Sequence, residues 1–327
     1  MKKEKISKKN LYLNCFNVAP GVWGLKDIFV NMYMIHNPID NNWILVDAGL
    51  KTSAPKIRRM AEHLFWPDTR PSAIVLTHAH FDHVGSLNTL AEEWEIPVYA
   101  HQMEKPYLTG ISSYPPPDPS VGGGFLSAMS WAYPRGPINI EARLEILPRD
   151  GSIPGMPEWK YIHTPGHAPG HISLYRHRDG VLIAGDAFVT TKQESVISVM
   201  LQTKELSGPP KYFTYNWNSA GRSVRTLAEL NPQIIATGHG KPMRGEEMRS
   251  SLHNLANHFE DLAVPSQGRY VGDPALVNEE GVQYIPPPHT YGLVLKLAGL
   301  TAAAIVGFLL TKNYTKKKKS LLPFSFN

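Results

Sequence analysis

The stretch from Thr77 to His83 places three imidazoles and one carboxylate within six positions, at His78, His80, Asp82 and His83. It directly follows the apolar run 73–76, which predicts a buried strand. Side chains two residues apart project to the same side of an extended backbone, so we expect His78 and His80 to face one point. Neutral imidazole and carboxylate are the ligands that zinc and similar divalent metals prefer. The spacing therefore predicts a metal site after a strand, not a histidine-rich surface loop.

Four further polar residues follow apolar runs that predict strands: Asp47 after 43–46, His167 after 159–163, Asp186 after 181–184, and His239 after 233–236. In layered α/β folds, sites assemble at strand ends and in the loops after them, because the sheet fixes their positions. Glycines beside three of these residues permit tight turns and close backbone approach, at Gly166, Gly185 and Gly238. The pattern predicts one site built from five strand ends.

The elements around these strands alternate in a way that predicts α/β layering. We expect hairpins over 17–35 and 172–184, and helices over 54–65, 84–94, 220–230 and 246–262. The segments 112–138 and 190–218 interrupt this order, the first with dense proline and glycine, and both carry large aromatic residues. The first segment is interpreted either as a lid over a substrate pocket or as a mobile surface insert, and the second as a further lid candidate.

The motifs together resemble those of the metallo-β-lactamase superfamily, over roughly 18–262. They read LVDAG (45–49), THAHFDH (77–83), TPGHAPGH (164–171), AGDAF (184–188) and GHG (238–240). The resemblance implies a four-layer αββα sandwich with two metals. One metal would bind His78, His80 and His167; the other would bind Asp82, His83 and His239, and Asp186 would bridge both. It also implies that Asp47 and His171 support the site without binding metal.

The same resemblance implies a hydrolase in which Asp82 and Asp186 are catalytic as well as metal-binding. Two divalent cations, two carboxylates and a bridging hydroxide leave one positive charge, which can stabilise an oxyanion on the substrate. Zinc lowers the pKa of bound water to about 7, from about 15.7 in bulk water. We therefore expect two Zn²⁺ per chain, with iron or manganese as alternatives, and hydrolysis of a carboxylic ester, lactone or thioester by a metal-bridging hydroxide.

With an aspartate at position 186, the chain resembles the glyoxalase-II-like and lactonase-like branches of the superfamily. The β-lactamases proper do not bridge their metals with an aspartate at this position. The lactonase branch often has a tyrosine where this chain has Val189, and Trp131, Tyr212 and Tyr215 are candidate substrate contacts instead. His101 is expected to be a satisfied polar residue. Three alternatives stay open: a mononuclear iron persulfide dioxygenase-like oxidoreductase, a phosphodiesterase, and a non-catalytic scaffold.

The net charge of +5 is concentrated in the chain ends. Residues 1–10 carry +4 and residues 312–327 carry +5, which leaves about −4 for the rest. A mildly acidic body argues against a nucleic-acid partner, and we expect a small-molecule substrate; the oligomeric state stays open. The single cysteine, Cys15, excludes an intrachain disulfide and favours a reducing compartment.

The composition divides the chain into five parts. We expect a basic arm (1–16), a catalytic domain (17–264), a linker (265–290), a hydrophobic membrane-anchoring helix (291–311) and a basic tail (312–327). The fifteen uncharged residues 297–311 span only about 22 Å as a helix. Extension back to Tyr291 gives 21 residues, which would cross a bilayer if Lys296 reaches the interface. The prediction is a membrane-anchored enzyme whose catalytic domain faces the cytoplasm.

Overall fold

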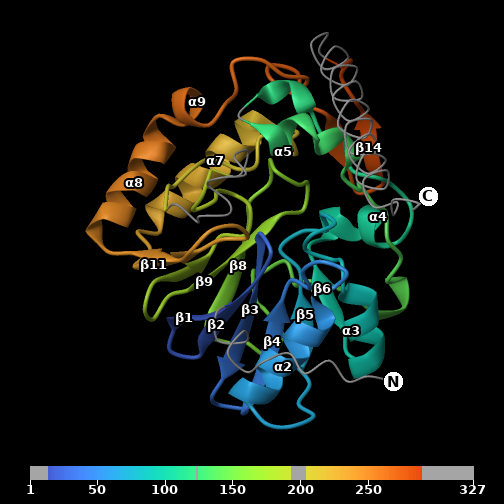
Figure 1. Ribbon diagram of the computed structural model, residues 1–327, viewed down its shortest axis with the longest axis vertical. Coiled ribbons are helices and arrows are strands. Elements are labelled where there is room, and N and C mark those ends of the chain that lie inside the picture. Colours follow the sequence, from blue (N-terminus) through green and yellow to red (C-terminus); the bar gives the residue numbers. More distant parts are fainter. Residues whose placement is uncertain (1–13, 123, 193–203, 289–327) are drawn as a thin grey trace, which may run out of the picture.

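Two β-sheets face each other and carry helices on their outer sides in the computed structural model, which describes residues 14–122, 124–192 and 204–288 (Figure 1). The first sheet has seven strands in chain order: β1 (Cys15–Ala19), β2 (Val22–Asp27), β3 (Val30–Asn37), β4 (Asn42–Val46), β5 (Ala73–Val75), β6 (Val98–Ala100) and β7 (Leu144–Ile146). Strands β1 to β4 pair antiparallel, and β4 to β7 pair parallel. The expected N-terminal hairpin is therefore part of a larger meander.

The second sheet has five strands in the order β12 (Met243–Arg244), β11 (Ile234–Ala236), β10 (Val181–Ile183), β9 (Ile172–Arg176) and β8 (Trp159–His163). Strands β10 and β11 are parallel and adjacent. The residues that follow them, Asp186 and His239, therefore leave the sheet on the same edge.

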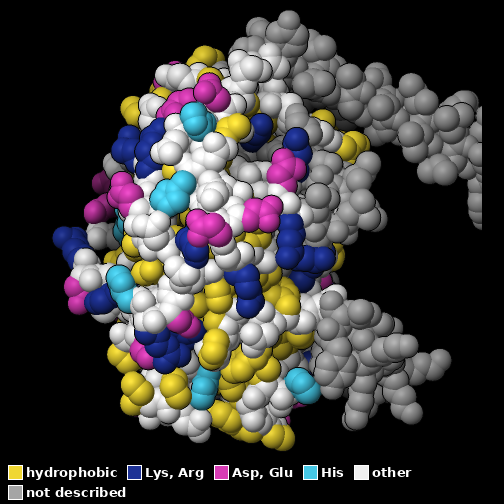
Figure 2. Space-filling model, turned by 90° about the vertical axis from the view of Figure 1, so that its left-hand side faces the viewer, with side chains coloured by type: hydrophobic (Ala, Val, Ile, Leu, Met, Phe, Trp, Pro, Cys, Tyr) yellow, Lys and Arg dark blue, Asp and Glu magenta, His cyan; other side chains and the backbone are white. Residues whose placement is uncertain are grey.

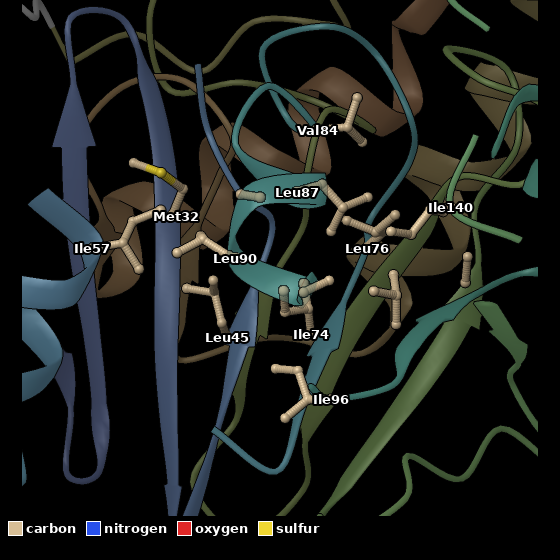
Figure 3. Packing of buried hydrophobic residues seen from close by; sticks show 14 of the residues in the cluster. Met32, Leu45, Ile57, Ile74, Leu76, Val84, Leu87, Leu90, Ile96 and Ile140 are labelled. Atoms are coloured by element: carbon tan, nitrogen blue, oxygen red, sulfur yellow. The ribbon is translucent and has the colours of Figure 1, made fainter. Parts of the chain in front are cut away.

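Three apolar clusters hold the layers together. One lies between the sheets and includes Ile35, Ile44, Leu174 and Ile183. A second lies between the first sheet and the helices α2 (Ala54–Leu64) and α3 (Leu87–Trp94) (Figure 3). A third lies between the second sheet and α7 (Trp217–Glu229) and α8 (Glu246–Asn257). A fully buried Leu or Ile contributes roughly 1.5–3 kcal/mol, so these contacts give a rigid support for the strand ends.

The helix boundaries differ from the expected ones for local reasons. Helix α7 begins at Trp217, not at 220, because the Asn216 side chain accepts a hydrogen bond from the N–H of Ser219. Helix α3 begins at Leu87, not at 84, since residues 81–86, which include Asp82 and His83, form turns. The helix expected over 246–262 is interrupted at His258, and its end forms α9 (Phe259–Leu262).

The segment 112–138 is irregular, as its proline and glycine content indicates, but it contains short helical turns. These are a 3₁₀ turn (Pro119–Val121), α5 (Phe125–Ala128) and a second 3₁₀ turn (Ser130–Ala132). A further 3₁₀ turn (Glu141–Arg143) precedes β7.

Where the sequence predicts a linker at 265–290, the structure has a hairpin of β13 (Leu276–Asn278) and β14 (Gly281–Tyr284). The chain before this hairpin is fixed to the segment 112–138. The Tyr270 hydroxyl donates to the Pro116 carbonyl at 2.6 Å, and Gln267 donates to the Ser120 carbonyl at 3.1 Å. The polar composition of 265–290 does not predict these contacts, because they are made with a segment that is distant in the sequence.

The membrane anchor expected at 291–311 lies outside the described residues. Within 14–122, 124–192 and 204–288, no helix has the length and apolar character needed to cross a bilayer. The uncharged core of the expected anchor is itself short, at about 22 Å against a hydrocarbon thickness of ~30 Å. We therefore correct this prediction and withdraw the hydrophobic C-terminal helix, the membrane as a partner and the membrane-anchored location.

One face of the molecule is shown in Figure 2, turned a quarter from the view of Figure 1. Lys and Arg side chains are interspersed there with Asp and Glu. Such a mixed surface produces no field of a single sign on this face.

Candidate metal centre

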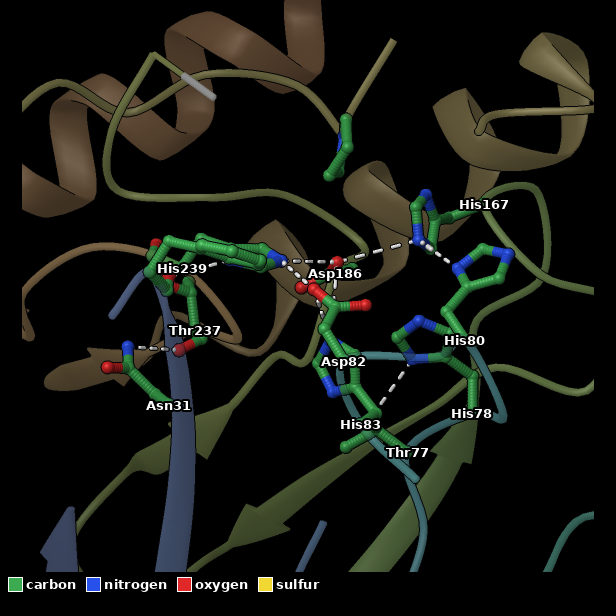
Figure 4. A network of polar contacts seen from close by, with 12 residues as sticks. Asn31, Thr77, His78, His80, Asp82, His83, His167, Asp186, Thr237 and His239 are labelled. Atoms are coloured by element: carbon green, nitrogen blue, oxygen red, sulfur yellow. Dashed lines mark hydrogen bonds and ion pairs between the residues drawn. The ribbon is translucent and has the colours of Figure 1, made fainter. Parts of the chain in front are cut away.

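Five strand ends meet at one edge of the two sheets and bring the expected ligand residues together (Figure 4). The chain after β4 supplies Asp47, the chain after β5 supplies residues 77–83, and the chains after β8, β10 and β11 supply His167, Asp186 and His239. All seven expected ligands are buried, with at most 6% of any residue exposed: His78, His80, Asp82, His83, His167, Asp186 and His239.

The ligand atoms form three overlapping groups, each with its members within 4.8 Å of one another. These groups are His78, His80 and His167; Asp82, His83 and His239; and His78, His83 and Asp186. The first two are the sets that the sequence resemblance implies for two metals. The third shows that Asp186 lies between them.

One oxygen of Asp186 faces both groups. Its Oδ2 lies 3.5 Å from His167 Nε2, 3.6 Å from His83 Nε2 and 3.1 Å from His239 Nε2. On one side, His80 Nδ1 and His167 Nε2 are 2.9 Å apart; on the other, Asp82 Oδ2 is 3.5 Å from His239 Nε2. A single carboxylate can therefore contact cations held by either group.

Unsatisfied buried atoms show that this donor set fits metal ions. Within the described chain, His78 Nε2, His83 Nε2 and Asp186 Oδ1 are buried and have no hydrogen-bond partner. Buried polar atoms without partners are rare because their desolvation is not compensated. Imidazole nitrogen and carboxylate oxygen converging in this way suit zinc or a similar divalent ion, which would satisfy these atoms.

The pKa shifts divide the centre into two halves. Burial, followed by the neighbouring imidazoles, holds the pKa of His78 and His80 well below the usual value, and burial lowers that of His167 to about 4. These rings stay neutral and keep a lone pair for a metal. At His83, burial alone would lower the pKa, but Asp47, Asp82 and Asp186 raise it well above the usual value. A cation in that half would replace a proton.

Asp47 orients this second half through its own hydrogen bonds. Its carboxylate accepts from the Thr77 N–H, from the Thr77 hydroxyl and from His83 Nδ1–H, each at 2.8 Å. Its backbone has φ +62°, a conformation that few non-glycine residues adopt. Such an outlier persists only where the surroundings stabilise it. Asp47 thus fixes the His83 ring and leaves Nε2 directed at the centre.

His239 and His171 are fixed in a similar way. His239 Nδ1–H donates to the Phe29 carbonyl at 2.8 Å, so Nε2 faces Asp186. His171 Nε2 accepts from the Asp186 N–H at 2.8 Å, and its Nδ1 pairs with the Thr164 hydroxyl at 2.8 Å. Both His171 nitrogens are therefore occupied, and its contact positions Asp186 through the backbone.

A cavity of about 190 Å³ opens onto the centre. Its wall is mostly apolar and aromatic and includes Phe29, Phe81, Tyr133, Tyr212 and Phe213. Tyr212 was an expected substrate contact. Trp131 is 38% exposed and Tyr215 is buried in the core beside α7, and neither lines this cavity. Tyr133 and Phe213 lie in the segments 112–138 and 190–218, which were expected as possible lids, although neither residue was named as a substrate contact. Phe29 was not expected at all, and Phe81 lies inside the THAHFDH motif.

Comparisons with known proteins agree with this geometry. The family profile described as the metallo-beta-lactamase superfamily matches residues 25–239. A probable metallo-hydrolase of Bacillus subtilis, YflN, is 44% identical over 248 residues, which cover 76% of this chain and 94% of that protein. The chain belongs to the metallo-β-lactamase superfamily. It is a metal-dependent hydrolase of an α/β sandwich fold, with His and Asp groups that could hold metal.

Two further similarities are more distant. The chain is 28% identical over 215 residues to the hydroxyacylglutathione hydrolase GloC of Haemophilus influenzae, covering 65% of this chain and 87% of that protein. It is similar in fold to the BJP-1 subclass B3 metallo-β-lactamase of Bradyrhizobium japonicum, with a TM-score of 0.51, 17% identity, and coverage of 76% of this chain and 92% of that one. At that identity the likeness concerns the fold alone.

Proposed function

We propose that this chain hydrolyses a carboxylic ester, lactone or thioester, uncharged next to the reacting bond, at a centre of two zinc ions. The observation that carries the proposal is the position of Asp186 Oδ2, within 3.1–3.6 Å of ligand nitrogens from both groups. A second complete group, Asp82, His83 and His239, supports two metals over the mononuclear iron dioxygenase alternative.

The metals would be held by His78, His80 and His167 on one side and by Asp82, His83 and His239 on the other, with Asp186 between. When bound, they supply Lewis acidity toward a carbonyl oxygen and lower the pKa of a water molecule. Asp82 and Asp186 supply two negative charges against four positive ones, so the site keeps a positive surplus. Asp47, His171 and the Phe29 carbonyl hold the side chains in place before substrate enters.

The cavity wall supports an apolar substrate of neutral charge. No Lys or Arg is among the described residues that line it, and aromatic rings form much of its surface. A substrate with a carboxylate or phosphate next to the reacting bond would have no cationic side chain to contact in this wall. The relationship to a hydroxyacylglutathione hydrolase supports the thioester as one member of the class.

The test is turnover of a substrate panel by the zinc-loaded full-length chain. We expect hydrolysis of at least one neutral ester, lactone or thioester, loss on chelation, recovery with zinc, and loss in His80→Ala. Phosphodiesters and cephalosporins serve as charged comparisons. Turnover of phosphodiesters alone, or activity that survives complete chelation, would contradict the proposal.

A variant pair tests the role of the cavity wall. Phe213 stacks on the His80 ring at 4.5 Å and lines the cavity. We expect Phe213→Ala to reduce kcat/KM for the better apolar substrates by about tenfold, because a lost apolar contact changes transition-state binding by ~1–3 kcal/mol. Trp131→Ala, outside the cavity, should leave kcat/KM unchanged; equal effects of the two substitutions would argue against this wall as the substrate contact.

A further inference from the structure

Glu104 is a buried carboxylate that the proposed chemistry does not use. It ends the 3₁₀ turn η1 (Gln102–Glu104), shortly after β6, and its exposed fraction is 0%. Among the glutamates in the described ranges it is the one that is buried. A buried carboxylate costs free energy unless hydrogen bonds compensate its desolvation. The hydrogen-bond partners of Glu104 therefore indicate what this side chain does in the structure.

The two oxygens of Glu104 contact two different ligand-bearing loops. Oε2 accepts from the N–H of Ala79 at 2.9 Å, and Ala79 lies between His78 and His80. Oε1 accepts from the N–H of Gly170 at 2.7 Å, in the loop that carries His167. One rigid carboxylate thus sets the separation of the loops that carry the first ligand group.

The approach of these loops is too close for any side chain at position 170. A Cβ atom built on Gly170 would lie 2.7 Å from the backbone nitrogen of Glu104 and 2.7 Å from its Cγ. Such distances essentially never occur for real Cβ atoms. Gly170, the second glycine of the TPGHAPGH motif, is therefore the position at which this loop packs directly against Glu104.

Tyr114 adds a third connection to the same ligand group. Its hydroxyl donates to Glu104 Oε2 and accepts from the Ala79 N–H, the latter at 2.9 Å. Its ring lies 4.5 Å from the His80 ring, and the Tyr107 ring stacks on it at 4.0 Å. Glu104 thereby also holds the ring that packs against His80.

We propose that Glu104 is a positioning residue. By holding the two loops that carry them, it sets the geometry in which His78, His80 and His167 bind one metal. The proposal builds on the metal centre of the proposed function, but it does not depend on which substrate is hydrolysed. The other half of the centre has separate supports, Asp47 for His83 and the Phe29 carbonyl for His239. Loss of Glu104 should therefore affect one metal position and spare the other.

The experiment measures zinc affinity by chelator competition in two background variants, each of which keeps only one of the two metal positions intact. His239→Ala leaves the first group complete, and His80→Ala leaves the second. Glu104→Gln keeps the shape but leaves one acceptor oxygen for three donors, the Ala79 N–H, the Gly170 N–H and the Tyr114 hydroxyl, so at least one of them loses its hydrogen bond to residue 104. We expect it to lower zinc affinity about ten- to hundredfold in the His239→Ala background, with no change in the His80→Ala background.

Two further variants protect the test against general loss of stability. Tyr114→Phe keeps the ring on His80 and removes only the hydroxyl, and we expect a smaller loss confined to the same background. Met60→Ala, buried in α2, removes core packing and should change neither affinity. Equal losses in both backgrounds, no loss in either, or the same pattern from Met60→Ala would overturn the proposal. Absence of ester hydrolysis with this zinc pattern intact would count against the proposed substrate class only.

Discussion

Two clusters of histidines in the described part of the chain differ in what their ring atoms contact. In the candidate metal centre, His78 Nε2 and His83 Nε2 are buried without a hydrogen-bond partner, and both belong to one group of possible ligands with Asp186. In the second cluster, His101 and His163 stack with centroids 3.9 Å apart beside a separate cavity of about 530 Å³. There His101 Nδ1 accepts from the Met103 N–H at 3.2 Å, and His163 Nε2–H donates to the Pro169 carbonyl at 2.9 Å.

The difference is that unsatisfied ligand atoms converge in the candidate metal centre, whereas the crowded imidazoles of the second cluster make hydrogen bonds to the backbone. Neither His101 nor His163 belongs to a group of possible ligands in the described chain. Their ring contacts stabilise the local fold instead. The expectation that His101 is a satisfied polar residue agrees with its hydrogen bond.

The largest expected effect is that of Asp186→Ala, which removes the carboxylate between the two ligand groups. We expect kcat/KM to fall about a thousandfold, or about 4 kcal/mol, because charge stabilisation by metal is worth several kcal/mol. Asp150→Ala, which removes a carboxylate at the cavity beside His101 and His163, is the control and should retain full activity. Similar losses in the two variants would remove the distinction between the clusters.

A smaller effect is expected of Asp47→Asn, which keeps the side-chain shape and removes the charge that orients His83. Zinc affinity should fall about ten- to hundredfold, as is typical of residues that hold a metal-binding histidine. Chelator competition measures it. An unchanged affinity would show that the His83 ring is positioned by packing and not by Asp47.

The smallest expected effect concerns His101 and pH. Burial and the neighbouring His163 lower the pKa of His101 to about 4, whereas the unfolded value is about 6.5. The unfolded chain therefore binds more protons between these values, so this contribution to stability is complete above pH 6.5 and is lost as the pH falls toward 4.

His101→Asn keeps an acceptor for the Met103 N–H but removes the titrating ring. As the pH falls from 6.5 to 4, we expect the free energy of unfolding of this variant to decrease by about 1 kcal/mol less than that of the parent. Partial exposure of the ring keeps the difference small. Urea unfolding at several pH values measures the difference. Parallel stability curves for the two proteins would contradict this account of the second cluster.

The sequence indicated which polar residues converge better than it indicated the cavity wall, for physical reasons. His78 and His80 follow a strand at fixed spacing, so local geometry alone brings them together. The expectation that Asp186 lies between the two ligand groups came from the resemblance, since spacing does not say which strands are neighbours. Phe29 and Phe213 line the cavity from a hairpin turn and an irregular loop. In such segments no periodicity of the sequence predicts which way a side chain points. The hairpin Leu276–Tyr284 was missed because its contacts are made with a segment about 150 residues away.

The most direct test of the central claim is the metal content of the purified full-length chain. The account predicts about two zinc ions per chain, about one in His80→Ala, and two in His163→Ala. A parent chain that takes up no metal would contradict it, as would equal metal contents in His80→Ala and His163→Ala.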